Sequence, residues 1–284
     1  MRRSLTTIGL AAFFIVCSQP QMTVQAIESH SIEELRAADQ ALVRELLARA
    51  EPLITRRKAE GAVNLLTFEE LYAPLSDAQR AFFDWMRTLT PEAVGGVRVP
   101  LGAPPARVEF ARVEAQTYTN NDGKSVTLDP QYLPRHVLEA YHRMMQAMAR
   151  DLGKRLLVDS GYRAPAYQLY LFGFYLAGNH HFSIRETNRF VALPGYSEHG
   201  APQRQAIDFI NEQGINGDGQ PEAFEALPEY HWLQQHAREY GFVLSYPRDN
   251  PLATSFEPWH WHFEGGTQQR MSSAGSVPGT KGTR

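Results

Sequence analysis

Apolar residues in the first third of the chain recur three or four positions apart, as they do along one face of a helix. This spacing predicts one helix over 31–49 and a second helix that begins near Ser76. Each predicted start carries a capping pair, Ser31 with Glu34 and Ser76 with Gln79. The two apolar faces are formed by Leu35, Leu42, Leu46, Phe82, Phe83, Met86 and Leu89.

Beyond about residue 105 the pattern changes to short segments separated by turn residues. A hairpin is predicted from the strands 108–119 and 125–128, joined by the turn at 120–123. Further strands are expected at 155–159, 205–210 and 259–263, and helices at 134–152, 165–176 and 227–240. This mixture favours an α+β fold, in which helices pack on a small antiparallel sheet with the site in a cleft, after a helical N-terminal region.

Residues 1–26 have the features of a secretory signal peptide. Arg2 and Arg3 precede an apolar stretch over 5–17, and 24–26 resembles a cleavage site. An uncleaved membrane anchor is the alternative. We expect an exported protein of the periplasm or cell envelope, with no stable membrane span once the signal is removed.

The composition indicates one sizeable core, because 43% of the 284 residues are hydrophobic and 21% are charged. The formal net charge is −3 and no long basic run follows the N-terminus, so nucleic-acid binding is not indicated. The predicted organisation is a signal peptide at 1–26, a helical region at 27–105, a catalytic domain at 106–270 and a flexible tail at 271–284.

The only cysteine, Cys17, lies inside the predicted signal peptide. The mature chain would therefore have neither a disulfide nor a thiol nucleophile, and any metal site must use His, Asp and Glu. Polar and reactive residues are concentrated in three segments, 160–163, 197–208 and 257–262. A hydrolytic zinc needs about three protein ligands and one open position, and these segments could supply them.

Strand alternation places Asp208 on the face opposite Ile207 and Phe209, and it places His260 and His262 together on one face. A carboxylate among apolar residues is costly unless it is paired or binds a metal. Asp208 could instead pair with an arginine, and the two histidines could lie on the surface. The chain has no H-E-x-x-H helix, which argues against the common zincin arrangement.

Four motifs resemble those of the VanY-like D-alanyl-D-alanine carboxypeptidases, a family related to D-Ala-D-Ala dipeptidases and murein endopeptidases. They are S-G-Y-R at 160–163, S-E-H at 197–199, A-I-D at 206–208 and E-P-W-H at 257–260. The resemblance covers roughly 130–265. Together the four motifs are specific, although each alone is weak.

The resemblance implies a zinc ion (Zn²⁺) and a role for each matching residue. It implies that His199, Asp208 and His260 are the zinc ligands, that Glu257 is the general base, and that Arg163 stabilises the oxyanion. It also implies that Ser160, Gln168 and Ser197 contact the substrate or support the residues that do. The implied substrates are peptidoglycan stem peptides that end in D-Ala-D-Ala.

The chain departs from the family pattern in two places. Eight residues, 200–207, separate His199 from Asp208, where the family usually has six. Pro202 and Arg204 are among these eight residues. We interpret the longer spacing as a two-residue loop insertion, which could reshape the substrate pocket. The second departure is His262, which is expected to contact substrate, to support a ligand or to serve as an alternative ligand.

The leading hypothesis is therefore a zinc D,D-carboxypeptidase. A D,D- or L,D-endopeptidase that cuts cross-linked murein would use the same zinc machinery. A catalytically inactive peptidoglycan-binding protein is a hypothesis of another class, and a serine hydrolase built on Ser197, His199 and Asp208 is a further one. The serine hydrolase lacks a G-x-S-x-G motif and would leave Glu257 without a role. Oligomeric state is not predicted.

Overall fold

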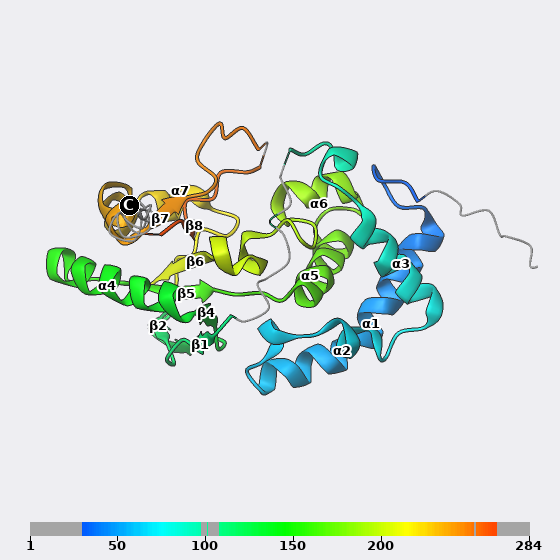
Figure 1. Cartoon of the computed structure of the whole chain (residues 1–284), viewed down its shortest axis with the longest axis horizontal. Coiled ribbons are helices and arrows are strands. Elements are labelled where there is room, and N and C mark those ends of the chain that lie inside the picture. Colours follow the sequence, from blue (N-terminus) through cyan, green and yellow to red (C-terminus); the bar gives the residue numbers. More distant parts are fainter. Residues whose placement is uncertain (1–29, 98–100, 102–107, 253, 266–284) are drawn as a thin grey trace, which may run out of the picture. The chain divides into compact units, whose positions relative to one another are not determined.

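The computed structural model describes residues 30–97, 101, 108–252 and 254–265 (Figure 1). All helices and strands below belong to one compact unit, Ser31–Arg284. The predicted signal peptide at 1–26 and the predicted tail at 271–284 lie outside the described residues. Among the described helices, none combines the length and the apolar character that a bilayer crossing requires.

The helical N-terminal region contains α1 (Ala37–Ala59), α2 (Phe68–Tyr72) and α3 (Asp77–Thr88). The predicted boundaries of the first helix were wrong. Glu34 N does donate to Ser31 Oγ at 3.4 Å, but the helix begins six residues after Ser31, because Leu35 N is bound to the carbonyl of Phe182. The helix also continues through Pro52, whose missing donor is outweighed by burial of the following turn. The second helix is confirmed, with both hydrogen bonds of its capping box formed.

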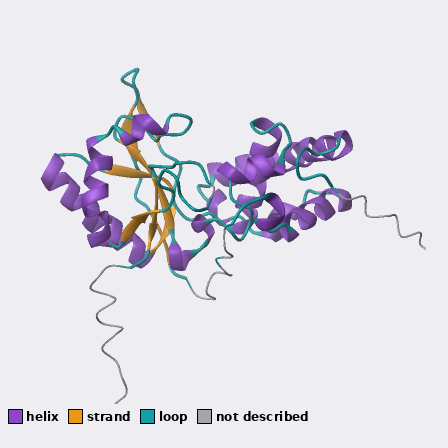
Figure 2. Ribbon diagram, turned by 90° about the horizontal axis from the view of Figure 1, so that it is seen from above, coloured by secondary structure: helices purple, strands orange, loops and turns teal. Residues whose placement is uncertain are grey.

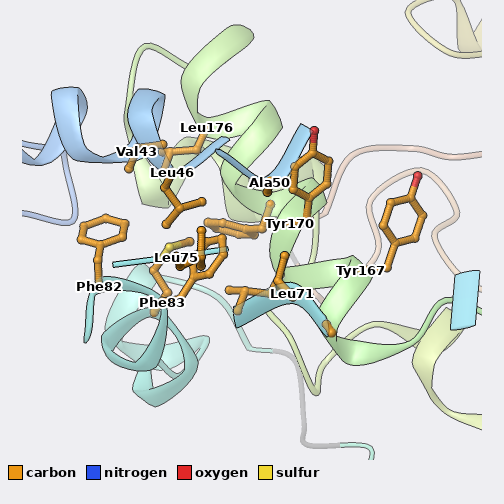
Figure 3. Packing of buried hydrophobic residues seen from close by; sticks show 14 of the residues in the cluster. Val43, Leu46, Ala50, Leu71, Leu75, Phe82, Phe83, Tyr167, Tyr170 and Leu176 are labelled. Carbon is orange, nitrogen blue, oxygen red and sulfur yellow. The ribbon is translucent and has the colours of Figure 1, made fainter. Parts of the chain in front are cut away.

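These N-terminal helices pack against α5 (Pro165–Gly178) and α6 (Ile184–Phe190), and Figure 3 shows some of the buried side chains of this core. The shared core contains Val43, Leu46, Leu71, Phe82, Phe83, Met86, Tyr170, Phe172, Leu176 and Ile184. The residues of the main sheet belong to a separate core. The N-terminal helices therefore do not cover the sheet, and they instead support α5, the helix that follows the S-G-Y-R motif.

Replacing the capping residue Ser76 by alanine is expected to lower the free energy of unfolding by about 1 kcal/mol, because the first turn of α3 loses a hydrogen-bond acceptor. Urea denaturation measures this change. Ser31→Ala is the matched control, since Ser31 has the same spacing to a polar partner but does not begin a helix. An equal loss in both variants would contradict the assignment of Ser76 as the cap.

The main sheet has four antiparallel strands in the order β5-β6-β8-β7 (Figure 1), and Figure 2 shows the strands in a view from above. Their bounds are β5 Leu156–Ser160, β6 Ala206–Asn211, β7 Phe242–Leu244 and β8 His260–Phe263. Two ribbons accompany the sheet, β1 (Phe110–Arg112) with β4 (Tyr132–Pro134) and β2 (Thr117–Thr119) with β3 (Ser125–Thr127). The predicted strand 108–119 is thus two strands with different partners, whereas the predicted hairpin turn is confirmed.

One face of the sheet packs on α4 (Arg135–Leu152) and α8 (Pro228–His236), with the short helix α7 (Pro221–Glu225) beside α8. The strands contribute Ile207, Phe209, Trp261 and Phe263 to this core, together with the methionines and aromatic residues of the two helices. Because side chains alternate along a strand, Asp208 and His260 lie on the opposite face. The predicted α+β fold with a small antiparallel sheet is confirmed.

Candidate metal centre

His199, Asp208 and His260 converge, with one potential ligand atom from each residue within 4.8 Å of the others. Asp208 and His260 are directly paired across the antiparallel strands β6 and β8. His199 lies in the short 3₁₀ turn Glu198–Gly200 that leads toward β6. The distance from Asp208 Oδ2 to His199 Nε2 is 3.1 Å, and that from Asp208 Oδ1 to His260 Nδ1 is 2.8 Å.

The orientation of His199 is fixed by a backbone contact. Its Nδ1 lies 2.7 Å from the carbonyl oxygen of Gly161, which can only accept a hydrogen bond, so the ring proton is on Nδ1. Nε2 then presents a lone pair toward the Asp208 carboxylate, and this buried atom has no hydrogen-bond partner. Two electron pairs that face each other in a buried site are unfavourable, and a cation between them removes the conflict. The donor set therefore fits a metal ion.

Gly161 is required here by close packing. A Cβ at this position would lie 2.5 Å from the backbone oxygen of Tyr132, so only glycine allows the approach. Gly161 N donates to Gln131 Oε1, which also accepts from Asn64 Nδ2 of the N-terminal region. A chain of hydrogen bonds thus runs from Asn64 to His199. No role was predicted for Asn64, because nothing in its local sequence marks a contact with a residue so distant in the chain.

Burial and neighbouring charges shift the pKa values of the three residues. Burial, together with Arg163, lowers the pKa of His199 to about 4, so this imidazole is neutral at pH 7. Burial opposes the charge on His260, but Asp208 and Glu198 outweigh it and raise the pKa of His260 to about 10. Burial also opposes the charge on Asp208, yet the two histidines hold its pKa well below the usual range. A metal that takes His260 Nδ1 must replace the proton there.

The three residues line a cavity of about 970 Å³. Five other predicted residues line the same cavity, namely Ser160, Arg163, Gln168, Ser197 and Glu257. Glu257 Oε2 lies 3.8 Å from His260 Nδ1, and Arg163 Nη2 lies 3.7 Å from Asp208 Oδ2. Both side chains are largely buried beside the metal centre, at 12% and 18% exposure.

Gln168 and Ser197 are buried in the cavity wall. The amide nitrogen of Gln168 donates to the carbonyl of Ala192 at 2.7 Å, whereas its Oε1 has no donor within the described residues. This oxygen is itself buried. The N-terminal region contributes Val63 and Asn64 to the same wall.

His262 is the one predicted site residue that the structure places outside this group. It is buried, but it does not line the cavity. Its Nδ1 lies 2.7 Å from Ser245 Oγ and its Nε2 lies 3.1 Å from Glu264 Oε1. The alternation along β8 was predicted correctly, but His262 pairs with Ala206 and not with Asp208, which places it two residue pairs away along the strands. A direct contact between His262 and substrate is therefore not supported by its position.

Glu198 received no predicted role, although it stands inside the S-E-H motif. The structure buries it, and its Oε2 lies 3.0 Å from Nε2 of His260. The available clue was its position next to His199. The ring of Tyr246, which also received no role, lies 4.7 Å from that of His260.

Comparison with known proteins identifies the class to which this fold and site belong. The family model described as VanY, D-alanyl-D-alanine carboxypeptidase, matches residues 130–266. The bifunctional D-Ala-D-Ala dipeptidase and carboxypeptidase VanXYC of Enterococcus gallinarum is 32% identical over 136 residues, which are 47% of this chain and 68% of that protein. The chain belongs to the VanY family, and at the level of the family the prediction of a peptidase is confirmed.

Two other similar proteins extend this comparison. YodJ of Bacillus subtilis is 30% identical over 142 residues, and the match spans 49% of this chain and about half, 48%, of that protein. The structure of the LD-carboxypeptidase LdcB is 23% identical, with a TM-score of 0.45 over 62% of this chain and 77% of that chain.

Proposed function

We propose that this chain is a zinc-dependent D-alanyl-D-alanine carboxypeptidase, which removes the terminal D-alanine from peptidoglycan stem peptides. The observation that carries the proposal is the convergence of His199 Nε2, an Asp208 oxygen and His260 Nδ1 in the wall of the cavity. Two imidazoles and one carboxylate are a donor set that suits a hydrolytic zinc. Membership of the VanY family supports the same activity and substrate class. Export to the cell envelope, where peptidoglycan lies, is part of the proposal.

Zinc, when bound, supplies Lewis acidity that polarises a carbonyl group and allows water to attack at neutral pH. Glu257 takes the proton of that water and returns it to the leaving amine. Arg163 donates hydrogen bonds to the oxygen that gains negative charge, and its planar guanidinium keeps its charge throughout. Ser160, Gln168 and Ser197, which line the cavity, contact the substrate nearby.

The geometry does not favour the serine-hydrolase alternative. In such a triad one nitrogen of the histidine faces the serine and the other faces the aspartate. Here His199 Nδ1 is bound to the Gly161 carbonyl and Nε2 faces Asp208. No nitrogen of His199 is left to activate Ser197.

Removal and return of zinc test the proposed activity. Dialysis of the protein against a chelator is expected to abolish the release of free D-alanine from purified muropeptides, and added zinc is expected to restore it. Mass spectrometry of the products distinguishes the alternatives. Cleaved cross-links without free D-alanine would replace the carboxypeptidase by an endopeptidase. Activity that survives full metal removal would overturn the zinc mechanism, and zinc binding without any cleavage would favour a peptidoglycan-binding protein.

A further inference from the structure

The carboxylate of Glu198 contacts His260 on the side of the ring opposite Asp208. Its side chain is 7% exposed and it does not line the cavity. Glu198 Oε2 accepts hydrogen bonds from His260 Nε2 at 3.0 Å and from Ser245 Oγ at 2.6 Å. Glu198 Oε1 accepts from Arg204 Nε at 2.6 Å. The carboxylate is therefore hydrogen-bonded on both oxygens and is held on the Nε2 side of His260, opposite Asp208 on the Nδ1 side.

This contact determines which nitrogen of His260 can bind a metal. A carboxylate can only accept, so Nε2 must carry its proton toward Glu198. Nδ1 lies 2.8 Å from Asp208 Oδ1 and carries a proton as well in the metal-free site. Because Nε2 keeps its proton toward Glu198, Nδ1 is the nitrogen that gives up its proton and offers its lone pair to a metal. The same logic fixes His199, whose partner is the Gly161 carbonyl. The acceptor that orients His199 is a neutral carbonyl, whereas Glu198, which orients His260, is a charged carboxylate. The charge of Glu198 also increases the basicity of the His260 ring.

Arg204 supplies the opposite charge for this buried carboxylate. Its side chain is 39% exposed, and its Nε donates to Glu198 Oε1, while Nη1 lies 3.4 Å from Glu264 Oε1 just after β8. Without a partner, a buried glutamate near Asp208 would be costly. Arg204 lies in the loop between His199 and Asp208 that is two residues longer than the family spacing. The longer loop therefore contributes a side chain to the support of the metal centre.

We propose that Glu198, held by Arg204 and Ser245, is a positioning residue that fixes the tautomer and orientation of His260 and thereby sets the zinc affinity of the site. This inference rests on the proposed zinc centre. It adds that Arg204, a residue of the longer loop, helps to hold the carboxylate that orients His260. It predicts that substitutions of Glu198 and Arg204, which do not line the cavity, weaken zinc binding.

Zinc titration of three variants tests the inference. Glu198→Gln keeps the shape of the side chain but removes its charge, and it is expected to raise the Kd for zinc by about 10–100-fold. Arg204→Gln is expected to raise the Kd in the same direction by a smaller factor. Arg155→Gln is the matched control, because Arg155 makes a similar contact, Nε to Glu212 Oε1 at 2.9 Å, but lies outside the cavity and the centre. It is expected to bind zinc as the parent chain does.

Two further measurements separate positioning from a general loss of stability. The visible absorption spectrum of the cobalt-substituted protein reports the geometry of the ligands, and it is expected to change in Glu198→Gln but not in Arg155→Gln. The melting temperature of each metal-free variant shows whether it is folded, and Arg204→Gln carries the test if Glu198→Gln does not fold. Parent-like zinc affinity in both variants would overturn this inference alone. If the parent chain itself binds no zinc, both this inference and the proposed function fail.

Discussion

Replacing Glu257 by glutamine is expected to lower kcat by about 10²–10⁴-fold while zinc content stays at the parent level. Glutamine keeps the size of the side chain in the cavity wall but cannot accept a proton from water. The carboxylate is well placed for that task, because it lies 3.8 Å from His260 Nδ1 and is 12% exposed. Metal analysis and the rate of D-alanine release from a model stem peptide measure the two quantities separately.

Glu212→Gln is the control for this variant, since Glu212 is a glutamate that pairs with Arg155 and does not line the cavity. It is expected to retain both zinc and turnover. If Glu257→Gln loses zinc together with turnover, Glu257 contributes to metal binding and the general-base assignment is wrong. Unchanged turnover with full zinc content would exclude Glu257 from the chemistry altogether.

The centre of the site could be predicted from the sequence because it depends on short-range rules. Strand alternation alone places Asp208 and His260 away from the apolar neighbours Ile207 and Trp261, and antiparallel pairing then brings the two residues opposite each other. The motifs supplied His199, which no periodicity would have found. The same alternation could not separate His260 from His262, because only the register between β6 and β8 decides which of them pairs with Asp208.

The surroundings of the site could not be predicted because they depend on contacts between distant segments. Arg204 reaches Glu198 only through the path of the loop that joins them, and this path has no periodic pattern. Likewise, the start of α1 is set by the contact of Leu35 with Phe182 rather than by the local capping sequence at Ser31. Tertiary contacts therefore override local preference both at the N-terminal helix and behind the metal centre.

His199→Ala is expected to abolish stoichiometric zinc binding and to lower the rate of D-alanine release by about 10³-fold or more. The reason is that Lewis-acid stabilisation of several kcal/mol is lost, and each 1.4 kcal/mol corresponds to about tenfold in rate. His142→Ala is the control, because His142 is an exposed histidine of α4 that is outside the cavity.

The His199 variant also tests whether the loss is specific to the metal. His199 is 1% exposed, so its removal leaves a small void, and the metal-free melting temperature of the variant shows whether the fold survives. A folded His199→Ala protein that still holds one zinc and turns over stem peptides would place the catalytic metal elsewhere. A folded protein without zinc, beside a Glu257→Gln protein that keeps zinc but does not turn over, separates the residue that binds the ion from the residue that moves the proton.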